Sequence, residues 1–180
     1  MLYSFGPMNL PSHGEQSEPW LRGTLTDVPP VHRAVLHALE LANEDIQRWC
    51  GSLSDAQLNA RPAGVAPVAF HLRHIARSVD RLLTYAEGKQ LTSAQLVTLK
   101  RELDAEANAA ELFAEFGAAM NQAAERIRAL VAVPLDVSRK VGRKELPTTV
   151  GGLLVHVADH TQRHVGQAIT TAKIVLAERS

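Results

Sequence analysis

Four long stretches of this 180-residue chain carry apolar residues at a spacing of three to four positions. Such spacing places apolar side chains on one face of an α-helix. It predicts long helices over about 27–51, 67–87, 105–131 and 149–177, a helical turn beginning near Ser54 and a shorter helix from Ser93 to about Leu103. Helices with one apolar face bury those faces against each other, so we expect an all-α fold built as a four-helix bundle.

The remaining segments divide the chain into two parts. Residues 1–26 contain prolines and glycines without periodicity, which predicts an irregular N-terminal arm. Residues 27–180 form the expected bundle. The stretch 135–146 mixes charges with Gly142 and is predicted to be a connecting loop, and no segment shows a convincing strand pattern. Aromatic residues make up only 4% of the chain, so the core must come mainly from Leu, Val, Ala and Ile.

Charge and composition argue against several classes of partner. The 19 basic residues are balanced by 19 acidic ones without a dense basic cluster, which makes nucleic acid a poor candidate partner. No apolar run approaches the roughly 20 residues that span a bilayer, so we expect no membrane partner. The first 20 residues do not resemble a secretory signal, and a single cysteine, Cys50, favours a reducing cytoplasmic location.

Five of the eight histidines fall in two clusters on predicted helices. His71 and His74 lie on the second long helix, and His156, His160 and His164 lie on the last. Residues four apart on a helix share a face, so one such pair can supply two imidazole ligands to a metal ion. A third ligand would come from the second helix.

Helical-wheel positions rank these candidates. On the last helix His164 lies about 60° from the centre of the apolar face, His160 about 100° and His156 about 140°, which favours His160 and His164 as the chelating pair. On the second helix His71 lies about 70° from that centre and His74 about 130°. Periodicity alone therefore favours His71 over His74, although a metal site can open at the edge of a bundle.

Two stretches resemble the DinB/YfiT-like family of metal-dependent proteins. They are HLRHIARSVDRLL, from His71, and HVADHTQRHVGQ, from His156, which includes Gly166 and Gln167 after the histidine pair. The resemblance implies an up-down-down-up bundle that binds a divalent transition metal, most often zinc or nickel, through one histidine of the second helix and an HxxxH pair of the last. Matched by position, the implied ligands are His74, His160 and His164. His71 and His156 are additional to this pattern, as further ligands or as neighbours of the ligands.

Three neutral imidazoles leave a bound ion its full charge and an open position, which favours chemistry over a purely structural role. Gln167, Ser78 and Arg81 are candidates for orienting a metal-bound water or an anionic substrate. Asp80 and Asp159 point away from the site on the wheel, so the sequence assigns no catalytic acid or base.

The resemblance implies a metal-dependent enzyme acting on a small molecule, with a thiol-dependent S-transferase as the leading activity and a low-molecular-weight thiol as co-substrate. A metal-dependent hydrolase is an alternative. A second alternative, of a different class, is a non-catalytic metal-binding or dimerising helical module, and a third is that the histidines bind nothing. A homodimer is expected for a bundle of this kind.

Overall fold

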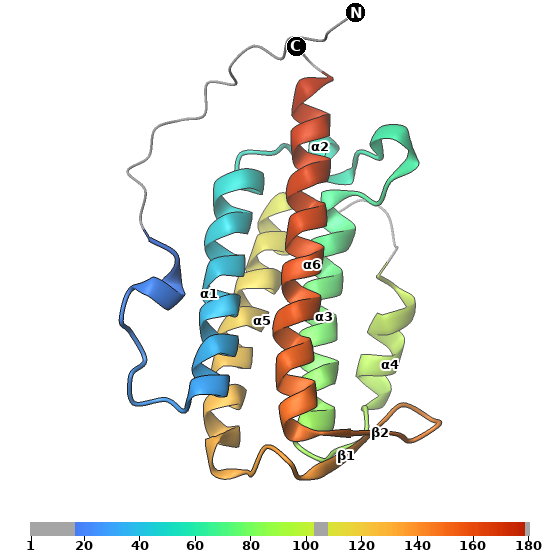
Figure 1. The fold of residues 1–180 in the computed structure, drawn as a ribbon. Coiled ribbons are helices and arrows are strands. Elements are labelled where there is room, and N and C mark those ends of the chain that lie inside the picture. The colour runs from blue at the N-terminus through green and yellow to red at the C-terminus, as the bar shows by residue number, and fades with distance from the viewer. Residues whose placement is uncertain (1–16, 103–107, 179–180) are drawn as a thin grey trace, which may run out of the picture.

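The computed structural model describes residues 17–102 and 108–178, and within them four long helices lie side by side (Figure 1). These helices are α1 (Pro30–Cys50), α3 (Val68–Ala86), α5 (Ala109–Ala129) and α6 (Val150–Ala177). α1 and α6 run in one direction along the bundle, and α3 and α5 run in the other (Figure 1). The predicted all-α bundle is confirmed.

Shorter elements connect the long helices and cover their ends. They are η1 (Pro19–Leu21), α2 (Asp55–Asn59), η2 (Pro62–Gly64), α4 (Ser93–Lys100) and η3 (Leu130–Ala132). α4 lies beside α3, away from α1 and α6 (Figure 1). Thr92, not Ser93, caps α4, because its hydroxyl accepts from the Gln95 amide while the Gln95 side chain accepts from the Thr92 amide.

The segment before α6 differs from the prediction. In the stretch predicted to be a loop, β1 (Ser138–Val141) pairs antiparallel with β2 (Leu146–Thr149), in a register that places Val141 opposite Leu146. Each strand has only four residues, too few to produce a readable alternation. Gly142 makes the turn with a φ of +69°. Thr149 then caps α6 by accepting a hydrogen bond from the Gly152 amide, as expected for a helix start there.

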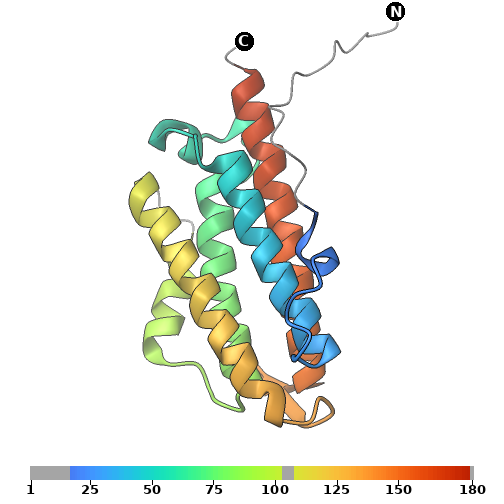
Figure 2. The ribbon, with the colours of Figure 1, turned by 90° about the vertical axis from the view of Figure 1, so that its left-hand side faces the viewer.

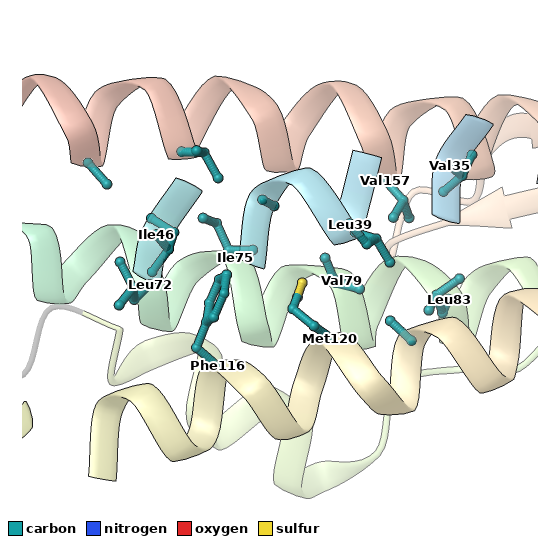
Figure 3. Packing of buried hydrophobic residues seen from close by; sticks show 14 of the residues in the cluster. Val35, Leu39, Ile46, Leu72, Ile75, Val79, Leu83, Phe116, Met120 and Val157 are labelled. Carbon is teal, nitrogen blue, oxygen red and sulfur yellow. The ribbon is translucent and has the colours of Figure 1, made fainter. Parts of the chain in front are cut away.

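Aliphatic side chains from all four long helices fill the core (Figure 3). Ile46, Ile75 and Phe116 are completely buried and come from α1, α3 and α5. Burial of each such side chain contributes about 1.5–3 kcal/mol. The view turned by 90° shows that the four helices are tilted against one another along their length (Figure 2). This packing fixes α3 beside α6, which is the pair that carries the histidines.

The described part of the predicted N-terminal arm packs against α1. The Arg22 guanidinium forms a bidentate ion pair with the Glu44 carboxylate, with N–O distances of 2.6 and 2.7 Å. It also donates to Glu40 at 3.1 Å. Residues 1–16 of the predicted arm and residues 103–107 of the predicted third long helix lie outside the described part of the chain. None of the helices in the described segments is long and apolar enough to cross a membrane.

Candidate metal centre

Three histidines from α3 and α6 converge at the surface between these helices. His74, His160 and His164 each offer a ring nitrogen, and these nitrogens all lie within 4.8 Å of one another. The His74 and His160 Nε2 atoms are 2.9 Å apart, and the His74 ring centroid lies 4.4 Å from that of His164. All three side chains are partly buried. The structure thus brings together the three residues that the sequence pattern nominates as ligands.

The antiparallel arrangement of α3 and α6 explains this convergence. Three residues along α3 rise about 4.5 Å and four residues along α6 rise about 6 Å, so two positions on one helix face two on the other. His74 therefore faces His160, while His71 faces His164 with their Nδ1 atoms 3.1 Å apart. Two nitrogens bound about 2.0–2.1 Å from one ion lie roughly 3–3.4 Å apart, so the 2.9 Å separation of the His74 and His160 Nε2 atoms is close to that of two ligands of a shared metal.

A buried carboxylate orients His74. The Nδ1 atom of His74 lies 2.7 Å from Glu102 Oε2, and Glu102 also accepts a 2.6 Å hydrogen bond from Arg81. With Nδ1–H donating to the carboxylate, Nε2 presents its lone pair to the other histidines. Phe70 also stacks on a face of the His74 ring, with centroids 5.4 Å apart. His74 is thus held by two contacts in the orientation of a metal ligand.

The surroundings disfavour protonation of His71, His160 and His164 and favour the charged form of Glu102. Burial, together with the charges of His164 and His74, lowers the pKa of both His71 and His160 to about 4. Burial and the charge of His74 also lower the pKa of His164. Burial alone would raise the pKa of the Glu102 carboxyl, but hydrogen bonds from His74 and Arg81 outweigh it and lower that pKa. Neutral imidazoles are the form that binds metals, so this donor set fits a divalent transition metal.

The additional histidines occupy different surroundings. His71 is buried, and its ring centroid lies 5.4 Å from that of His164. It is not one of the three histidines whose ring nitrogens lie within 4.8 Å of one another. His156 is exposed over 48% of its side chain, and its Nδ1 lies 3.7 Å from Asp159. The wheel ordering on α6 agrees with this exposure. On α3 the wheel describes burial correctly, yet the less buried His74 is the residue that joins the cluster.

The three polar candidates also differ in their contacts. The Ser78 hydroxyl donates to the Ile75 carbonyl at 3.1 Å, within its own helix. Arg81 reaches the site through Glu102. Gln167 lines a pocket beside the histidines. Asp80 bonds to Arg126, and Asp159 bonds to Arg163, so neither carboxylate joins the cluster.

The pocket adjoins the cluster at His71 and has a volume of about 400 Å³. One wall is formed by Val65 and Ala66, which precede α3, and the other by α6. The α6 residues that line it are Arg163, Gly166, Gln167, Thr170, Thr171 and Ile174. A pocket of this size can hold a small molecule. It is connected to the cluster through His71, whose Nδ1 lies 3.1 Å from that of His164.

Sequence reasoning missed Glu102. It lies 28 positions beyond His74, after a short helix without an apolar face that would reveal its orientation. Carboxylate partners of metal-binding histidines are common, but the chain has 19 acidic residues and no spacing rule selects one of them.

Comparison with known families agrees with this geometry. Residues 38–168 match the model of the DinB superfamily. The matched segment contains His74, His160, His164 and Glu102, and it covers well over half of the chain. A comparison with curated proteins found no match. On the family match, supported by the helical fold, the chain belongs to the DinB superfamily.

Proposed function

We propose that this protein is a metal-dependent enzyme that binds one divalent transition metal, zinc or nickel, through His74, His160 and His164. The observation that carries the proposal is the convergence of three imidazoles near a pocket that is large enough for a small molecule and is lined by the neighbouring His71. When bound, a metal with an open position supplies Lewis acidity that lowers the pKa of a coordinated thiol or water. The proposed activity is transfer of a low-molecular-weight thiol to a small electrophile.

The protein's own residues position the reactants. Glu102 holds the His74 ring and keeps its Nδ1 proton, so that Nε2 remains free. His71 and His164 share a hydrogen bond between their Nδ1 atoms, which restricts rotation of both rings. Each contact reduces the freedom of a group that would otherwise have to be ordered during the reaction.

Thiol transfer suits the surroundings of the cluster better than hydrolysis does. A metal-dependent hydrolase commonly uses a carboxylate as a general base toward water. Glu102, the carboxylate in direct contact with the cluster, is already bonded to His74 and Arg81. Among the residues that the structure describes, no acidic side chain lines the pocket. A thiol that has lost its proton is already a strong nucleophile and needs no such base.

The proposal is tested first by elemental analysis of protein purified without an affinity tag. We expect about one metal per chain, bound with the high affinity usual for multiple imidazole ligands. The metal-loaded protein should then accelerate conjugation of small thiols to members of a broad electrophile panel. A stoichiometric metal without any thiol-dependent turnover would contradict the transferase, and hydrolysis of test esters by the same sample would favour the hydrolase instead.

A non-catalytic metal-binding or dimerising module is the alternative of a different class. A cobalt-substituted sample distinguishes the two, because azide or a thiol changes the visible spectrum only if the ion has an exchangeable position. An unchanged spectrum would favour the non-catalytic module. The proposed homodimer is tested separately by light scattering of the purified protein.

A further inference from the structure

The pocket beside the histidine cluster has an uneven distribution of charge. Among the residues that the structure describes, Arg163 is the only charged side chain in its lining. Arg163 is also close enough to His160 and His164 for its charge to act on both rings. A divalent ion on the cluster would add further positive charge near the pocket. An anionic ligand therefore matches the field in this pocket.

Arg163 is available to a ligand despite its ion pair. Its Nη2 donates to Asp159 at 2.6 Å, which uses one of the five N–H donors that a guanidinium carries. Both side chains are more than half exposed, and ion pairs in such surroundings are weak and easily exchanged. A planar guanidinium also matches a carboxylate in shape, which allows two parallel hydrogen bonds.

The rest of the lining suits a short apolar body. Val65, which precedes α3, and Ile174 of α6 both line the pocket with exposed aliphatic side chains. Gly166 also lines the pocket, and a Cβ added there would meet no atom within 4 Å. The absence of a side chain at this position therefore leaves part of the pocket volume open, and a large residue there would fill it without a backbone clash.

We propose that this pocket binds a small carboxylate with a short apolar body, its acid group paired with Arg163 and its body against Val65 and Ile174. The inference rests on the proposed function in assigning that ligand as a reactant of the metal centre. The carboxylate belongs either to the thiol or to the electrophile.

The first test is calorimetric binding of three probes of equal length: hexanoate, hexanol and hexylamine. We expect hexanoate to bind the metal-loaded protein at least tenfold more tightly than either other probe. Arg163→Gln should abolish this preference while leaving hexanol binding unchanged. Equal binding of hexanoate and hexanol, or a preference that persists in Arg163→Gln, would overturn the proposal, since the latter result would indicate direct ligation to the metal alone.

A second variant tests the location without touching a charged group. Gly166→Leu should weaken hexanoate binding at least tenfold by filling the pocket. Gly117→Leu is its matched control, because Gly117 is also a helical glycine with no atom within 4 Å of an added Cβ, on α5, outside the pocket. Both variants gain helix propensity and should fold. Equal hexanoate affinity in the two variants would place the ligand elsewhere.

Binding to the pocket can be measured without the metal centre. The same titrations in the metal-free His160→Ala, His164→Ala variant report on the pocket alone, and an Arg163-dependent preference for hexanoate should remain there. Simultaneous binding of hexanoate and 2-mercaptoethanol to the cobalt-substituted protein would assign the carboxylate to the electrophile, and mutual exclusion would assign it to the thiol. Either result supports the carboxylate site. Loss of the preference for hexanoate in the metal-free variant would contradict the claim that the pocket binds a carboxylate without the metal.

Discussion

The two helices that carry the histidines support their side chains differently. On α3, His74 is held by the buried carboxylate of Glu102, which Arg81 in turn holds at 2.6 Å. On α6, the corresponding contact of His164 is to a neutral ring, that of His71. Hydrogen bonds to a charged partner are roughly twice as strong as those between neutral groups. His74 is therefore the most firmly oriented member of the cluster.

The two sides of the site therefore differ in rigidity and in access to solvent. On the α3 side, His74 is held by Glu102, which follows α4, so this ring has a fixed orientation. The α6 side borders the pocket, where Arg163 and Gln167 are exposed and a ligand can enter and leave. A site with one rigid side and one accessible side suits catalysis better than a closed structural metal site does.

The largest expected effect comes from removing both α6 histidines of the cluster. His160→Ala combined with His164→Ala should reduce the metal content from about one ion per chain to below about a tenth, because one imidazole cannot hold a transition metal against buffer. Elemental analysis after dialysis measures this. His156→Ala is the matched control, since His156 is exposed and should leave the content unchanged. Loss of metal in that control would place His156 among the ligands.

Removing the charge that orients His74 should have the next largest effect. Glu102→Gln keeps the size of the side chain but replaces the charged acceptor, and we expect a loss of about 10–100-fold in metal affinity. Competition with a chromophoric chelator measures the affinity, and circular dichroism checks that the fold is retained. An unchanged affinity would show that the Glu102 contact contributes to folding only and would remove the difference between the two helices.

The positions of the long helices could be predicted because their apolar residues repeat over many turns. α1, α3 and α6 begin and end within about three residues of the expected bounds, the usual uncertainty for helix ends. The hairpin before α6 could not be predicted in the same way. Its four-residue strands are stabilised by pairing with each other, and pairing between segments leaves no local periodicity.

Helix periodicity predicted the α6 pair of the cluster, the family resemblance and not the wheel indicated His74, and the supporting residue Glu102 was not predictable. Spacing on α6 selects His160 and His164 because both depend on one helix. The choice of His74 over the more buried His71 depends on Glu102, which the chain brings in from the end of α4. Contacts between distant segments follow from tertiary packing, so neither the wheel nor composition could identify this carboxylate.

The pKa values within the cluster predict a pH dependence of the metal-free protein. His71 and His160 have folded pKa values of about 4, below the ordinary 6.5, so the unfolded chain takes up protons first as the pH falls. Stability should be constant above about pH 7.5, fall between about pH 6.5 and 4, and lose no more from these groups below that range.

Urea unfolding of the metal-free protein at pH 7.5 and pH 5 measures this effect. Both pH values lie above 4.5, the ordinary pKa of a Glu carboxyl, so Glu102 contributes little to the difference in stability between them. We expect a lower midpoint at pH 5 and a smaller difference between the two pH values in His160→Gln. A midpoint that rises on acidification would contradict the direction of the pKa shifts.

The smallest effect is expected at His71, and it decides how the α6 side is supported. If His71 only orients His164 through the 3.1 Å contact of their Nδ1 atoms, His71→Asn should lower metal affinity by less than about tenfold, a smaller loss than in Glu102→Gln. The visible spectrum of the cobalt-substituted variant should then keep the intensity of the unaltered protein. If His71 were a fourth ligand, its removal would weaken binding as much as the loss of His74 and change that intensity. α3 would then supply two ligands, and the open position that thiol transfer requires would be occupied by a protein ligand.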